Sequence, residues 1–109
     1  MTAFDEYFEA SRLELMANQF KDYVQHPIEI MFLRENENCS HYRWKFSDSV
    51  PLEQRGVTDF RRLMGKLIED FIDYRKQFDV LPNNEGIVHI DSGNLWVEWI
   101  SDGGTELSN

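Results

Sequence analysis

The feature that most constrains this fold is a long amphipathic segment at residues 58–78. Its apolar side chains recur at steps of three and four residues, which places them on one face of an α-helix. They are Phe60, Leu63, Met64, Leu67, Ile68, Phe71 and Tyr74. Three carboxylates, Glu69, Asp70 and Asp73, fall opposite this stripe and predict a solvated helix face. An apolar face of this length must pack against a second layer of structure.

The segments on either side of this helix predict the strands of that layer. Residues 28–33 and 41–46 alternate in polarity, so they should pair as an antiparallel hairpin with a longish loop. Residues 87–90 and 95–100 should form a second hairpin, with Gly93 at positive φ in its tight turn. An N-terminal helix at about residues 2–24 should end before Pro27.

The predicted element order is therefore α-β-β-α-β-β, which indicates the α+β class. We expect a four-stranded, mainly antiparallel sheet with both helices packed on one face. At 109 residues the chain should form a single domain at residues 1–101, followed by a flexible acidic tail at 102–109. Its three Trp, four Tyr and eight Phe exclude a disordered chain and favour an aromatic core.

Composition also bears on location. The single cysteine, Cys39, excludes an intrachain disulfide and fits a reducing compartment. No apolar run approaches the ~20 residues that a membrane-spanning helix needs. The first residues are acidic, whereas a secretory signal begins with basic residues. We therefore expect a cytoplasmic protein without a membrane partner.

The net charge of −9 disfavours direct binding to nucleic acid, where affinity comes mainly from Lys and Arg meeting phosphate. The same charge favours association with basic proteins. It is unevenly distributed, because residues 82–109 contain no Lys or Arg. The acidic residues of that segment are Glu85, Asp91, Glu98, Asp102 and Glu106.

Cys39 and His41 form the only sequence cluster that suggests chemistry. A catalytic cysteine needs a base within hydrogen-bond reach and a third group that orients the base. Neither a glycine-rich turn nor a helix start precedes Cys39, so the sequence predicts a loop cysteine and no enzyme. Zinc sites usually show two pairs of closely spaced ligands, and only this one pair is present. We accordingly expect no metal and no cofactor.

The remaining candidate site is the sheet face that points away from the helices. If Leu95, Val97 and Trp99 face the helices, the residues between them face away, and an exposed face this apolar favours protein contact. Arg43 and Lys45 fall on the same face. The predicted partner-binding residues are Trp96, Glu98, Ile100, Met31, Leu33, Asp91 and Asp102. Two alternatives are that the tail or a loop covers this face, and that the strand phase is shifted by one residue.

Together these patterns favour a non-enzymatic, acidic protein-binding module. Its most concrete form is an inhibitor. Such an inhibitor would resemble an immunity protein, an antitoxin or a phage protein that blocks a host defence complex. Its partner would be a basic nuclease or nucleic-acid-binding effector, whose charged cleft an acidic protein can fill. An alternative is a structural or regulatory homodimer joined through the open sheet face. A third alternative is a small enzyme that uses Cys39 and His41.

Overall fold

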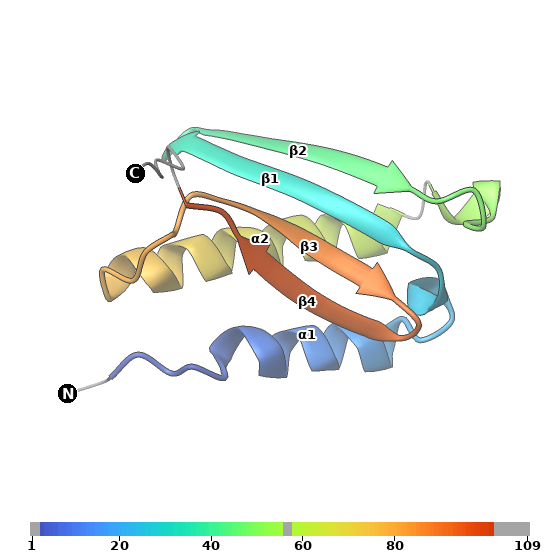
Figure 1. Ribbon diagram of the computed structural model, residues 1–109, viewed down its shortest axis with the longest axis horizontal. Helices are drawn as coiled ribbons and strands as arrows, with labels where there is room; N and C mark the ends of the chain where they lie inside the picture. Colours follow the sequence, from blue (N-terminus) through green and yellow to red (C-terminus); the bar gives the residue numbers. More distant parts are fainter. Residues whose placement is uncertain (1–2, 56–57, 102–109) are drawn as a thin grey trace.

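The computed structural model describes residues 3–55 and 58–101 and has two layers, a sheet and a pair of helices (Figure 1). The sheet contains β1 (Ile28–Asn36), β2 (Cys39–Phe46), β3 (Glu85–Asp91) and β4 (Asn94–Trp99). Its strand order is β2-β1-β3-β4, and every neighbouring pair is antiparallel. Both helices lie on the same face of the sheet. The predicted α+β class and architecture are confirmed.

The central helix α2 (Thr58–Gln77) matches the predicted segment to within one residue. Its buried residues are Phe60, Met64, Ile68, Phe71 and Ile72. They pack against the inward side chains of the two central strands, which are Ile28, Ile30, Phe32, Val88 and Ile90. Ile72, which is 1% exposed, was absent from the predicted stripe.

The first helix, α1 (Phe8–Gln19), is shorter than the predicted segment at both ends. Before it, the Asp5 carboxylate accepts a hydrogen bond from the Tyr7 backbone N–H (2.9 Å). After it, the chain turns into a short 3-10 helix, η1 (Tyr23–Gln25), which buries Tyr23 and Val24 in the core. Helical spacing continues through these residues, but the backbone leaves the regular helix at Phe20, where φ is −119° and ψ is 41°.

The two hairpins differ from each other in how well sequence predicted their turns. The second has the expected tight turn, with Ser92 at φ 50° and Gly93 at φ 82°. The first was predicted to have a longish loop, and this is wrong, because β1 and β2 extend to a short turn at residues 37–38. The Asn36 side chain stabilises that turn by accepting a hydrogen bond from the Asn38 N–H (2.8 Å).

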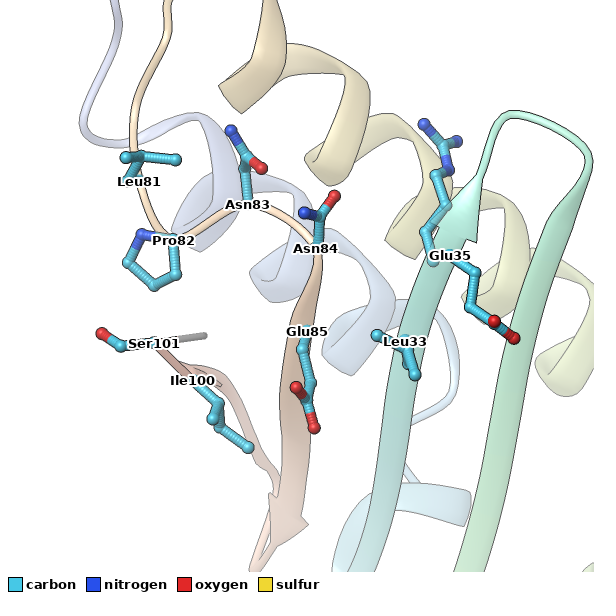
Figure 2. A pocket seen from close by; sticks show the side chains of 10 residues that line it. Leu33, Glu35, Leu81, Pro82, Asn83, Asn84, Glu85, Ile100 and Ser101 are labelled. Atoms are coloured by element: carbon cyan, nitrogen blue, oxygen red, sulfur yellow. The ribbon is translucent and has the colours of Figure 1, made fainter. Parts of the chain in front are cut away.

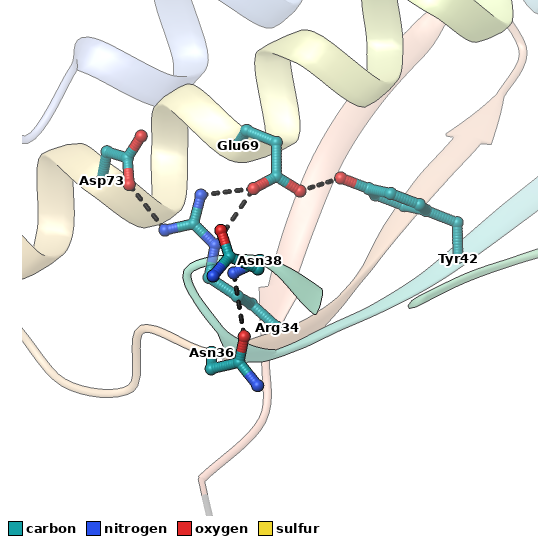
Figure 3. Close-up of polar contacts among 6 residues, drawn as sticks. All are labelled: Arg34, Asn36, Asn38, Tyr42, Glu69 and Asp73. Carbon is teal, nitrogen blue, oxygen red and sulfur yellow. Dashed lines mark hydrogen bonds and ion pairs between the residues drawn. The ribbon is translucent and has the colours of Figure 1, made fainter. Parts of the chain in front are cut away.

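The first hairpin is fastened to α2 by a polar network (Figure 3). The Arg34 guanidinium donates to Glu69 (Nε to Oε1, 3.0 Å) and to Asp73 (Nη1 to Oδ1, 2.6 Å). The Tyr42 hydroxyl donates to the second oxygen of Glu69. The predicted solvated face is therefore wrong for Glu69, whose side chain is 30% exposed because β1 carries Arg34 over it. It holds for Asp73, which pairs with Arg34 but keeps a side chain that is 65% exposed. Asp70 is also exposed as predicted.

Within residues 3–55 and 58–101, neither helix has the length and apolarity to cross a membrane.

Candidate functional site on the outer sheet face

The sheet face opposite the helices carries the candidate site, and we call it the outer face. The strand phase inferred from sequence is confirmed, because Leu95, Val97 and Trp99 pack against the core whereas Trp96 is 47% exposed. By strand alternation the outer face comprises His41, Arg43 and Lys45 of β2, Glu29, Met31 and Leu33 of β1, Glu85, Ile87, His89 and Asp91 of β3, and Asn94, Trp96 and Glu98 of β4. Neither α1 nor α2 covers it (Figure 1).

Strand register arranges the outer face into rows that run across the sheet. In the central row, Met31 lies opposite Arg43 on one side and Ile87 on the other, and Ile87 lies opposite Glu98. This row therefore begins with a base at the β2 edge, passes through two apolar side chains and ends with an acid at the β4 edge. Cross-strand neighbours of this kind have side chains within about 5.5 Å at Cβ, close enough to form one surface.

The row nearest the β1–β2 turn also begins with a basic residue on β2 and an apolar residue on β1. Leu33 lies opposite His41 on one side and Glu85 on the other. Ile100 directly follows β4, and its N–H donates to the Glu85 carbonyl oxygen (2.9 Å), so it extends this row. In these two rows the outer face has basic side chains along β2, an apolar centre and acidic side chains on β3 and β4, whereas in the third row Glu29 lies between Lys45 and His89.

The apolar centre forms a groove of about 250 Å³. Its walls include Met31, Leu33, Ile87 and Ile100, with His41, Arg43 and Glu85 at the margins. At the end of the sheet the groove meets a larger hollow of about 570 Å³, because Leu33, Glu85 and Ile100 line both (Figure 2).

The far wall of that hollow comes from the segment that precedes β3. Figure 2 shows Leu81 and Pro82 on this segment, across the hollow from the end of β4. The Leu81 side chain is 78% exposed, so it continues the apolar surface beyond the edge of the sheet. The combined surface is large enough to receive a peptide segment or a protruding side chain of another protein.

His89 organises the other half of the outer face. Its ring stacks on Trp96, with centroids 5.2 Å apart and planes 18° from parallel. Its Nε2 lies 2.8 Å from Glu98 Oε1, and its Nδ1 lies 3.6 Å from Glu29 Oε2. This stack orients the Trp96 indole while leaving Trp96 47% exposed to a partner.

The structure places six of the seven predicted partner-binding residues on this surface. Met31, Leu33 and Ile100 line the groove, and Trp96 and Glu98 contact His89. Asp91 lies at the end of β3, opposite Asn94. Asp102, together with the predicted tail at 102–109, lies outside the described residues, as does the alternative in which that tail covers the face.

Sequence reasoning missed several residues of the outer face, among them Glu85, Ile87 and His89 of β3. The signal was present, because Val88 and Ile90 predict the buried phase of β3 and thereby the exposed one. An apolar centre within a charged margin is the composition of protein-contact surfaces, in which large apolar side chains anchor and charged ones select. Comparisons of the chain with protein-family models, with curated proteins and with solved structures found no match.

Proposed function

We propose that this chain is a non-enzymatic protein-binding module that engages its partner through the outer face. The groove between Leu33, Met31 and Ile87 is the observation that carries this proposal. Contiguous apolar surface on a small domain is costly in water, and such patches usually mark contact sites. Trp96, stacked on His89 of the same face, supplies the aromatic anchor typical of binding hot spots.

The favoured partner is a basic protein, and the inhibitor function inferred from sequence remains the most concrete form. Glu85, Asp91 and Glu98 lie on one side of the outer face, within a chain whose net charge is −9. Carboxylates arranged beside an apolar anchor can occupy the phosphate-binding cleft of a nuclease or nucleic-acid-binding effector, and they accelerate encounter with it. An immunity, antitoxin or phage anti-defence protein would act in this way.

A homodimer is the second candidate, and the row pattern of the outer face favours it specifically. A two-fold axis parallel to the strands would place β2 of one copy over β4 of the other. Arg43 would then face Glu98 of the second copy, and Met31 would face Ile87 of the second copy, in the same row. Isologous interfaces require this kind of self-complementarity.

A site-specific crosslinking experiment tests the proposal. A photoreactive amino acid replaces Ile87 in the centre of the outer face, and in a matched control it replaces Leu15, which is exposed on α1. We expect the Ile87 position alone to crosslink to a basic protein in cells. With that partner purified, Trp96→Ala should raise the dissociation rate and weaken the binding free energy by about 2 kcal/mol. The pair Asp91→Asn and Glu98→Gln should slow association and flatten its salt dependence.

Sedimentation of the purified chain separates the two candidates. A concentration-dependent dimer that Arg43→Glu disrupts, and that Arg43→Glu combined with Glu98→Arg restores, would favour the homodimer over the basic partner. Equal crosslinking from the two positions, in a chain that stays monomeric, would contradict both uses of the outer face.

A further inference from the structure

Three side chains of different ligand types converge at the tip of the β1–β2 hairpin. The Cys39 Sγ lies 3.4 Å from His41 Nε2 and 3.9 Å from Glu35 Oε1. The same carboxylate oxygen also contacts His41 Nε2. The three ligand atoms all lie within 4.8 Å of one another. Each of these groups is a common zinc ligand in proteins.

The hairpin explains why these residues meet. Cys39 and His41 are two residues apart on β2, so their side chains leave the same face of the strand. Glu35 is the extra residue of a β-bulge, because Arg34 pairs with Ser40 and Asn36 pairs with Cys39. A bulge redirects the side chain of its strand, and here it brings the Glu35 carboxylate to the β2 residues.

The backbone that carries these ligands is well supported on both sides of the bulge. The neighbouring Arg34 is anchored to Glu69 and Asp73 of α2, and Asn36 closes the turn through Asn38. Ligands on a supported hairpin are held near their binding geometry before an ion arrives, which lowers the cost of ordering them.

The arrangement differs from that of a catalytic cysteine. A nucleophile–base–orienter chain places the thiol on one nitrogen of the imidazole and the carboxylate on the other. Here Cys39 and Glu35 both approach Nε2 of His41, and they also approach each other. Three donor atoms around a common point are the geometry of a metal centre.

The two distances from the Cys39 sulfur agree with that interpretation, whereas the contact between His41 and Glu35 is a direct hydrogen bond that a bound ion would have to separate. Zinc–ligand bonds of about 2.0–2.3 Å at tetrahedral angles would hold the sulfur about 3.6 Å from each of the other two ligand atoms. The observed separations from Cys39 Sγ are 3.4 and 3.9 Å. A thiolate and an imidazole together select Zn²⁺ over Mg²⁺ or Ca²⁺, which prefer sites made only of oxygen.

We propose that Glu35, Cys39 and His41 form a Zn²⁺-binding site, with water as the fourth ligand. The side chains of Glu35 and His41 are 55% and 57% exposed, so the fourth position faces solvent. Sequence reasoning predicted no metal because only Cys39 and His41 have ligand spacing, and the third ligand arrives from β1 through the bulge. This site does not depend on the proposed partner-binding function.

Titration of the untagged chain tests the site. Calorimetry with Zn²⁺ should show one ion per chain, with release of a proton because a coordinated thiol is deprotonated. Co²⁺ in place of Zn²⁺ should give a thiolate-to-cobalt charge-transfer absorption. Saturating Zn²⁺ should slow alkylation of Cys39, the single cysteine, and a chelator should reverse this protection.

Ligand variants and matched controls decide the outcome. Cys39→Ser and Glu35→Gln should each weaken Zn²⁺ binding by about tenfold or more, and Cys39→Ser should abolish the cobalt absorption. Two control variants should leave the affinity for Zn²⁺ unchanged. They are Glu37→Gln in the adjoining turn and His89→Gln in the other histidine–carboxylate cluster. Circular dichroism establishes that each variant is folded. Unchanged affinity in folded Cys39→Ser, one ion per two chains, or alkylation indifferent to Zn²⁺ would each overturn the proposal.

Discussion

Two glycines, Gly86 and Gly65, illustrate how the surroundings of a single residue decide the effect of the same added methyl group. Gly86 lies buried in β3, where a Cβ would stand 2.7 Å from Phe32 Cζ and 2.8 Å from the Glu98 carbonyl oxygen. Gly65 lies within α2, where a Cβ would meet nothing within 4 Å. The first position therefore requires glycine for close approach, and the second does not.

We expect Gly86→Ala to lower the free energy of unfolding by about 1–3 kcal/mol, because the Glu98 backbone cannot yield without disturbing the β3–β4 ladder. Gly65→Ala should raise that free energy by about 0.5–1 kcal/mol, since alanine loses less backbone entropy in a helix. Urea denaturation of the two variants and the parent chain measures both effects. Changes of the same sign in the two variants would show that one of these environments is wrongly described.

At the scale of elements, Glu69 joins α2 to the first hairpin. Burial alone would raise the pKa of Glu69, but the hydrogen bonds from Tyr42 and Arg34 together hold this pKa below its ordinary value of 4.5. Burial, and then the hydrogen bond to Glu69, raises the pKa of the Tyr42 phenol above its ordinary value. Both shifts favour the charge states present at neutral pH, an ionised carboxylate and a neutral phenol.

These shifts predict how stability depends on pH. A carboxyl whose pKa is lower in the folded state stabilises the fold above its unfolded pKa, and this contribution disappears as pH falls through the folded pKa. Glu69→Gln should therefore destabilise the chain at neutral pH, and its difference from the parent should shrink as pH falls below 4.5, the ordinary pKa of the carboxyl. Urea midpoints across this range measure the effect. Asp70→Asn, next to Glu69 on the exposed side, is the control, and an equal pH response from it would refute the assignment.

At the scale of the whole molecule, Arg75 joins segments that are far apart in sequence. Its Nε donates to Glu9 of α1 (2.7 Å), and its Nη1 donates to the Pro82 carbonyl before β3 (2.8 Å). Its guanidinium also lies over the Trp99 ring of β4, 4.2 Å from the centroid. Trp99 Nε1 donates to Glu9 (3.0 Å), which closes the cluster.

Because the Arg75 and Glu9 side chains are only 15% and 17% exposed, removal of one partner leaves the other charge poorly solvated. We expect Arg75→Met to cost about 3 kcal/mol of unfolding free energy. The double variant Arg75→Met with Glu9→Gln should lose less unfolding free energy than the sum of the losses in the two single variants, because it no longer contains an unpaired Glu9 carboxylate. A double-mutant cycle by urea denaturation measures this coupling, and strictly additive costs would show that the cluster does not act as a unit.

Much of the candidate site could be predicted from sequence because strand alternation is a local property. The pattern of residues 95–100 alone indicated that Trp96, Glu98 and Ile100 turn away from the helices. The same logic brought Met31 and Leu33 to that face. It did not reveal Ile87 as the centre of the groove, because that role depends on which strand lies beside β1.

By itself, then, the sequence determined the α+β class, the extent of α2, the phase of the strands and the turn at Gly93, all of which follow from spacing along one segment. Tertiary structure alone decided the strand order β2-β1-β3-β4, the contact of Arg34 with Glu69, and the meeting of Glu35 with Cys39 and His41. Periodicity reports which face of an element is apolar. Partners across elements depend on register, bulges and the packing of the whole chain, and no short stretch of sequence encodes these.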